Sequence, residues 1–333
     1  MELDINNRFV FDINKENDYE AHYILWNDYK QEIMMMFRYA LLKRPNEGGS
    51  NIKVWACFWD QKKPENNVGW IKEYPLSDLR LSNNNYRLEI GNSGMDKTSA
   101  WGDISNGDKK LRWRFDLDVS NSIAVDRVPG VREYQFFVNF YSSYCRHKIN
   151  GWVEVNNDHY EIKNINSSDG HYSNIQNLRS WNWGNCVNFK EDPDFLFEGI
   201  SAYHNDWTTA SSWLFFYWKG KRYESNIIDA MFYNRELSSE LNRWSFSAEK
   251  NGVCFQGQMT ADPQTMILLT HPLPDGSSLY TTITLNANLV IDIYEKDSHN
   301  EWQKVQTVTA EKATFEVTKP VRNKCVTREF EIL

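Results

Sequence analysis

Residues 169–189 hold the densest group of side chains that could act on a ligand. Trp181 and Trp183 stand two positions apart, so in a β-strand both indoles point to one face, and Asn185 follows on that face. Two indoles beside amide groups form a large, weakly polar surface, and Asn188 adds an amide that a pure core rarely tolerates. We therefore predict a substrate-binding strand on the inner face of a β-barrel. Packing of the two indoles in a core is the alternative.

Two side chains near this segment could transfer protons. His171 carries an imidazole that can serve as an acid or a base near pH 7. Asp206 lies beside Trp207 and could act as an acid where burial disfavours its charged form. We expect His171 and Asp206 to be catalytic and Trp207 to contact the substrate. A histidine bonded to a loop carbonyl and a plain surface turn around Asp206 are the respective alternatives.

Two further substrate-binding candidates lie in the first fifty residues. Arg38 interrupts the apolar run 34–42, and on the inner face of a barrel its guanidinium could bind a carboxylate or an enolate. An outward, solvated arginine is the alternative. Trp26 belongs to the first expected strand, and we assign it a substrate contact as well.

Motifs for metal ions, nucleotides and a serine nucleophile are missing from the sequence. Its seven histidines form no HxH or HExxH pattern, and the five cysteines form no CxxC pair. The glycine pair at 91–94 lacks the strand-to-helix context of a phosphate loop, and no GxSxG elbow occurs. We predict that the protein uses no metal ion and no cofactor. Scattered cysteines in odd number fit reduced thiols in a cytoplasm.

The elements that must position these residues are β-strands. Leu111, Trp113, Phe115 and Leu117 alternate with polar residues, as in a strand with one buried face. Similar runs recur along the chain, and Gly-containing turns separate them, for example at 105–108 and 219–221. More than a dozen short strands predict an all-β barrel or sandwich protein. One eight-stranded barrel closes in roughly 150 residues, so 333 residues predict two domains, 1–170 and 171–333.

The same segments resemble a known family. Asp-Gly-His-Tyr at 169–172 and Trp-Asn-Trp-Gly-Asn-Cys-Val-Asn-Phe at 181–189 are similar to the signature of the tocopherol cyclase-like proteins. These proteins form a superfamily with carotenoid 1,2-hydratase (hydroxyneurosporene synthase) and lipocalin-like Diels–Alderases. Runs at 99–117, 148–157 and 213–223 resemble its hairpins in the same order.

The resemblance implies two tandem lipocalin-like antiparallel β-barrels around a pocket for a hydrophobic substrate. It also implies roles for two residues of the signature. It implies that Tyr172 contacts the substrate. Ser173 and Asn174 occupy the place of the family's acidic residue, which makes Asn174 a catalytic candidate.

Composition narrows the choice of function. With 37 basic and 45 acidic side chains the formal charge is −8, which argues against binding to nucleic acid. No run reaches the 18 apolar residues of a membrane helix, and the first 20 residues lack a secretory pattern. We expect a cytoplasmic, cofactor-independent cyclase or isomerase that folds a polyene, prenyl or polyketide-like substrate. A non-catalytic carrier of lipophilic ligands is the alternative, and a carbohydrate-binding module is a third.

Overall fold

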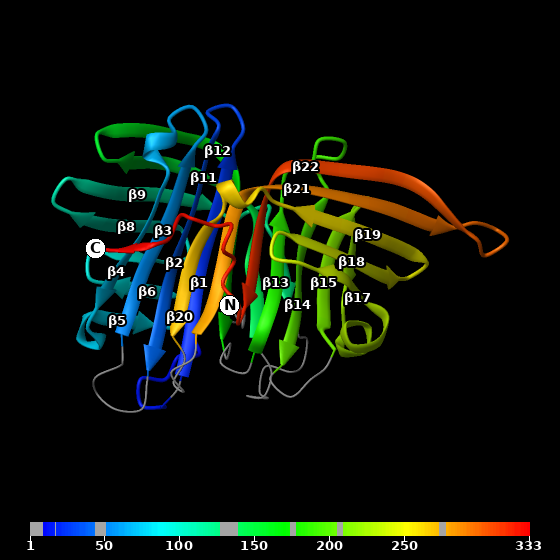
Figure 1. Ribbon diagram of the computed structural model, residues 1–333, viewed down its shortest axis with the longest axis horizontal. Helices are drawn as coiled ribbons and strands as arrows, with labels where there is room; N and C mark the ends of the chain where they lie inside the picture. Colours follow the sequence, from blue (N-terminus) through cyan, green and yellow to red (C-terminus); the bar gives the residue numbers. More distant parts are fainter. Residues whose placement is uncertain are drawn as a thin grey trace. The chain divides into compact units, whose positions relative to one another are not determined.

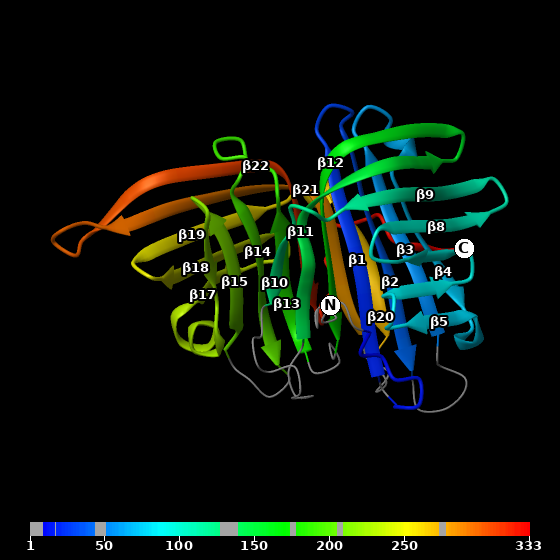
Figure 2. The same ribbon diagram turned by 180° about the vertical axis from the view of Figure 1, so that it is seen from behind.

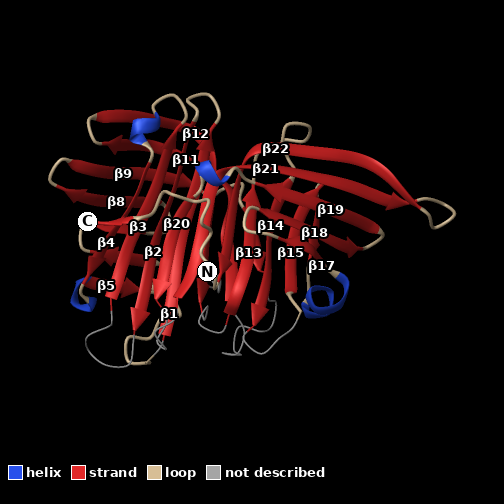
Figure 3. Cartoon of the chain, viewed as in Figure 1, coloured by secondary structure: helices blue, strands red, loops and turns tan. Residues whose placement is uncertain are grey.

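The computed structural model describes residues 9–16, 18–43, 51–126, 139–173, 178–204, 209–272 and 278–333. These residues form two large curled β-sheets, of 13 and 10 strands (Figure 1). Helical structure is confined to short turns such as η1 (Pro64–Asn66) and η4 (Asp229–Tyr233), as Figure 3 shows. The all-β, barrel-like fold predicted from the alternating strands is thus confirmed.

The first sheet belongs to unit 1, which comprises the described residues up to 126, residues 139–173 and residues 330–333. Its strand order is β23-β4-β3-β2-β1-β12-β11-β9-β8-β7-β6-β5, and β10 pairs with β11 (Figure 2). All its described pairs are antiparallel except β23 with β4. The strands are β1 (Asp18–Asp28), β2 (Ile33–Lys43), β3 (Asn51–Asp60), β4 (Val68–Tyr74), β5 (Leu79–Ser82), β6 (Arg87–Ile90), β7 (Ser93–Met95), β8 (Ser99–Asn106), β9 (Lys109–Asp118), β10 (Ile123–Asp126), β11 (Asn139–Val155), β12 (Asp158–Ser173) and β23 (Glu331–Ile332).

The second sheet belongs to unit 2, whose described residues are 178–204, 209–272 and 278–329. Its strand order is β16-β15-β14-β13-β22-β21-β19-β18-β17, and β20 pairs with β21. The strands are β13 (Leu178–Cys186), β14 (Leu196–His204), β15 (Ser211–Trp218), β16 (Lys221–Glu224), β17 (Arg235–Ser239), β18 (Arg243–Lys250), β19 (Val253–Thr260), β20 (Ile267–Pro272), β21 (Ser278–Lys296) and β22 (Trp302–Lys319). Our domain limits, 1–170 and 171–333, stay a prediction for independently folding domains.

Each unit has its own apolar core on one face of its sheet. In unit 1 the alternating residues of β9 are buried as expected, and Trp26 packs edge-on against Phe115 with ring centroids 5.8 Å apart. In unit 2 aromatic rings stack, with 4.1 Å between the centroids of Phe216 and Phe255. Rings of this size contribute most of the apolar area that such cores bury.

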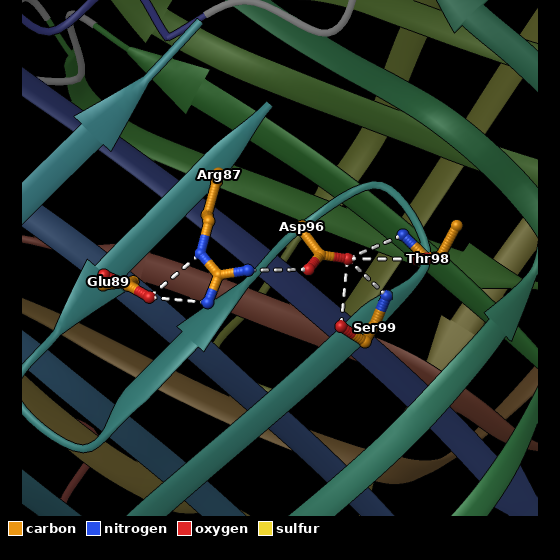
Figure 4. Close-up of polar contacts among 5 residues, drawn as sticks. All are labelled: Arg87, Glu89, Asp96, Thr98 and Ser99. Atoms are coloured by element: carbon orange, nitrogen blue, oxygen red, sulfur yellow. Dashed lines mark hydrogen bonds and ion pairs between the residues drawn. The ribbon is translucent and has the colours of Figure 1, made fainter. Parts of the chain in front are cut away.

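Turns stabilised by local backbone geometry and side-chain hydrogen bonds separate the strands. Lys219 and Gly220 both have positive φ, the geometry of a tight hairpin turn between β15 and β16. Figure 4 shows a second device, in which the Asp96 carboxylate accepts hydrogen bonds from the backbone N–H groups of Thr98 and Ser99, both at 2.9 Å. The same carboxylate pairs with Arg87 at 3.4 Å, and this joins the turn before β8 to β6.

Several strands are buried on both faces, which the alternation pattern did not reveal. In β2 every residue from Ile33 to Leu41 is buried, although only alternate ones belong to the unit 1 core. Strand β13 is buried in the same manner from Ser180 to Cys186. The faces opposite the two cores are therefore also shielded from water there. They carry five of the predicted site residues: Arg38, Tyr172, Trp181, Trp183 and Asn185.

Candidate functional site

The indoles of Trp181 and Trp183 lie on the face of β13 that points away from the unit 2 core. The other face carries Gly184, where an added Cβ would lie 2.3 Å from the Met259 sulfur, and Cys186, which is a core residue. Because side chains alternate along a strand, Trp181, Trp183 and Asn185 occupy the opposite face. Our expectation of an inner-face strand is wrong in this respect. The two-residue period places the indoles together, but it does not say which face meets the core.

Each indole is bonded to a buried carboxylate on a neighbouring strand. Trp181 Nε1 donates to Glu316 Oε1 of β22 at 2.8 Å, and Trp183 Nε1 donates to Glu198 Oε1 of β14 at 3.4 Å. In the strand register Glu316 lies opposite Trp183, and Glu198 lies opposite Asn185. Both bonds therefore run diagonally across the sheet. We name these five residues the indole–carboxylate cluster.

The cluster combines an apolar surface with groups that can move protons. Glu198 is fully buried and Glu316 is 4% exposed, so both carboxylates lie in surroundings that exclude bulk water. A carboxyl group fixed beside a ligand can act as a general acid or base. Indole faces can also stabilise a cation that forms on the ligand.

Sequence reasoning missed both glutamates because they are far from the tryptophans along the chain. The bonded partners are 15 positions apart for Trp183 and 135 apart for Trp181. A signal was present nonetheless. Each glutamate is the one charged residue in an apolar strand sequence, Phe-Leu-Phe-Glu-Gly-Ile at 195–200 and Ala-Thr-Phe-Glu-Val at 313–317.

In unit 1, two of the predicted residues meet on the face opposite the core. Arg38 is 2% exposed, and its guanidinium donates a hydrogen bond to the hydroxyl of Tyr172. Its central carbon lies 4.4 Å from the ring of Trp55, 4.9 Å from that of Tyr172 and 5.7 Å from that of Tyr23. Arg38 is thus a buried cation among aromatic rings and not a solvated surface arginine. It lies on the face of β2 opposite the unit 1 core, so it fits neither the inner-face position nor the solvated alternative.

His171 lies on the other face of β12, toward the unit 1 core. It stands opposite His22 of β1, with ring centroids 4.9 Å apart. His22 is bonded to Glu20 at 3.0 Å and to the hydroxyl of Tyr86 at 3.3 Å. His171 therefore belongs to a strand and not to a loop, and it joins a buried group of acid–base side chains. Sequence reasoning named only His171 of this group as a site residue.

The remaining predicted residues do not join these groups. Trp26 is a unit 1 core residue, and it lies on the face opposite Arg38. Asn188 follows the end of β13 and is partly exposed; its carbonyl accepts a contact from Cys186 Sγ at 3.4 Å. Asn174, Asp206 and Trp207 lie outside the described residues.

Three further features of the described part of the chain bear on the kind of site it can hold. No group of three or more His, Cys, Asp or Glu side chains there is arranged to hold a metal ion. None of the five cysteines forms a disulfide bond, and three of them are buried. Of the helical segments that the structure describes, none has the length and apolar character needed to cross a bilayer.

Comparison with known proteins identifies relatives by structure and not by sequence. No family model matches the chain, and no curated protein matches its sequence. Several solved structures match over almost the whole length. The chain has their fold.

Three of these structures are informative. A candidate AttH from Nitrosomonas europaea has 11% identity and a TM-score of 0.55, covering 93% of this chain and 94% of its own. Kievitone hydratase from Nectria haematococca has 10% identity and a TM-score of 0.57, covering 96% and 94%. CghA, solved with Sch210972, has 5% identity and a TM-score of 0.54, covering 91% and 89%. The fold implied by the sequence resemblance is thereby confirmed.

Proposed function

We propose that the protein is a cofactor-independent enzyme that cyclises, isomerises or hydrates a hydrophobic small molecule. The observation that carries this proposal is the bonding of two buried glutamates to two indoles in the indole–carboxylate cluster. We further propose a polyene, prenyl or polyketide-like substrate, because such chains match a broad aromatic surface. Five cysteines that form no disulfide bond support a cytoplasmic location.

The chemistry needs one proton donor and a surface that holds the substrate in a reactive shape. Glu198 or Glu316 would protonate an alkene or carbonyl, and its carboxylate would take a proton back after ring closure or addition of water. The indole N–H groups orient the two carboxylates. A positioned acid contributes about 10²–10⁴ in rate, and productive orientation of the substrate adds roughly 7 kcal/mol.

Structural relatives support this class of reaction without naming the substrate. One protein with this fold is a hydratase, and another was solved with the compound Sch210972. Sequence identities of 5–11% show that the fold is shared, and they do not transfer a reaction or a substrate to this chain. The reaction assigned to this chain therefore depends on its own residues.

The test compares glutamine variants of the cluster. Wild type, Glu198→Gln and Glu316→Gln are incubated in D₂O with prenylated quinols and linear polyenes, and mass spectrometry detects deuterated isomers or water adducts. We expect the variant that lacks the acid to lose about 100-fold in turnover with little change in binding. Glu249→Gln, at an exposed position of β18, is the matched control. Equal turnover in all four proteins would exclude an acid role for the cluster.

Ligand binding is tested separately through the tryptophans. An apolar ligand on the cluster should quench indole fluorescence, and Trp183→Ala should weaken binding about tenfold, or about 1.4 kcal/mol. Asn185→Leu removes an amide at similar volume. If the protein binds such ligands but turns none of them over, it is a carrier of lipophilic ligands and not an enzyme. No change in binding in either variant would make β13 a purely structural strand.

A further inference from the structure

A second group of ionisable side chains lies in unit 2, on the face of β13 opposite the indole–carboxylate cluster. Asn182 alternates with Trp181 and Trp183 in β13, so it occupies the core-side face. There it meets residues near the ends of three other strands. We name the group the rim cluster; it consists of Asn182, Tyr203, Glu236, Ser239 and Lys319.

Hydrogen bonds fix the carboxylate of the rim cluster at both oxygens. Tyr203 donates to Glu236 Oε1 at 2.8 Å, and Asn182 Nδ2 donates to Glu236 Oε2 at 2.6 Å. The second N–H of Asn182 donates to Ser239 Oγ at 2.8 Å. Both amide hydrogens are thus used, and the Asn182 oxygen has no hydrogen-bond partner among the described residues.

The amine of the rim cluster is held by the Ser239 hydroxyl and the Tyr203 ring. Lys319 Nζ donates to Ser239 Oγ at 2.5 Å and lies 5.8 Å from the centroid of the Tyr203 ring. Arg179 lies over the same ring at 5.7 Å. Tyr203, Glu236, Ser239 and Lys319 are all partly exposed, so a small molecule can reach them.

Burial shifts the protonation of these groups toward their neutral forms. It lowers the pKa of Lys319, against the attraction of Glu236, and the charge of Arg179 lowers it further. It also raises the pKa of Glu236 and raises that of Tyr203 to about 12. A neutral amine is a nucleophile, and a protonated carboxyl is an acid.

We infer that the rim cluster is a carbonyl-binding site at which Lys319 forms an imine with an aldehyde or ketone. Nζ attacks the carbonyl carbon, a C–N bond forms, and the carbonyl oxygen takes a proton from Glu236. The nitrogen then returns a proton to the Glu236 carboxylate, which passes it to the carbinolamine hydroxyl. That hydroxyl leaves as water, and the protonated imine remains beside the Glu236 carboxylate. Each carbonyl consumed yields one water, and no oxidant or reductant takes part.

The experiment uses the full chain, propanal as the probe and cyanoborohydride to trap the imine, with peptide mass spectrometry as the readout. We expect Lys319 to be alkylated at neutral pH about tenfold faster than Lys324, an exposed lysine that serves as the internal control. This ratio is measured in the wild-type protein and depends on no variant. Equal rates at the two lysines would overturn the inference.

A variant then separates acid catalysis from simple reactivity of the amine. Glu236→Gln should lower alkylation of Lys319 by propanal about tenfold. It should not lower acetylation of Lys319 by acetic anhydride, because that reaction needs no proton for a departing water. A parallel loss in both reactions would refute the role of Glu236. Glu249→Gln, at an exposed position outside both clusters, should leave the labelling unchanged. Because the labelling needs no turnover of a hydrophobic substrate, its outcome is independent of the test of the proposed enzyme site.

Discussion

At the scale of single residues, the glutamates of unit 2 differ in what holds them. Glu198 and Glu316 accept hydrogen bonds from indoles on one face of the sheet, whereas Glu236 is bound by Tyr203 and Asn182 at its rim. Buried carboxylates are uncommon unless they are bonded or functional. Glu198 and Glu316 are buried, whereas Glu236 is partly exposed and has other partners, which supports two separate sites in one unit.

Glu236 should make stability depend on pH. Its pKa in the folded protein is raised above the ordinary value of 4.5, mainly by burial, so folding favours the protonated form. Its contribution to the free energy of unfolding is therefore fully present below pH 4.5 and is lost as pH rises through the folded-state pKa. Urea denaturation of wild type and Glu236→Gln across this range should show the decline in the wild type alone. Parallel pH profiles would contradict the assignment.

Gly184 should be hard to replace. An added Cβ would lie 2.3 Å from the Met259 sulfur and 3.3 Å from the Trp244 ring. We expect Gly184→Ala to cost about 1–3 kcal/mol in unfolding free energy, as for an overpacked core. Because the nearest atom is on a flexible side chain, Met259→Ala should cost less in the Gly184→Ala background than in wild type. If the losses in unfolding free energy from the two substitutions simply add in urea denaturation, the Gly184–Met259 contact does not limit the packing of the core.

At the scale of elements, short strands depend on their turns. Strand β7 has three residues, and its link to β8 is organised by the Asp96 carboxylate, which also meets Arg87 (Figure 4). Asp96→Ala removes several hydrogen bonds and should lower the unfolding free energy by about 1–2 kcal/mol. Thr98→Ala keeps the backbone donor and should cost less. Equal and negligible losses in thermal denaturation would show that the turn forms without Asp96.

At the scale of the whole molecule, the two units have separate cores and separate sheets. A substitution that destabilises one core should therefore lower the stability mainly of the unit that contains it. Phe255 is fully buried and stacks on Phe216, so Phe255→Ala should cost about 3–5 kcal/mol. In low urea, hydrogen exchange should accelerate in β19 and β21 while β1–β3 stay protected. Equal acceleration in both units would indicate one cooperative unit.

Much of the fold follows from local patterns in the sequence. Alternation in β9 and the Gly-containing turns at 105–108 and 219–221 are properties of a few consecutive residues, and the structure has strands and turns there. The joint placement of Trp181 and Trp183 on one face follows from the strand period alone. Arg38 and Tyr172 were both named from the sequence, but their hydrogen bond was not predicted.

What the tertiary structure alone decided is which residues become neighbours across the sheets. Strand pairing brings Glu316 to Trp181 over 135 positions. Packing between β13 and β17, which do not pair, brings Glu236 to Asn182 over 54 positions, and no local period carries that information. The face of β13 that meets the core depends on Met259 and Trp244 in other strands, so the sequence left it open. When a strand is buried on both faces, the alternation of apolar and polar residues no longer marks which face meets the core. The chemistry of this chain therefore resides in contacts that only folding creates.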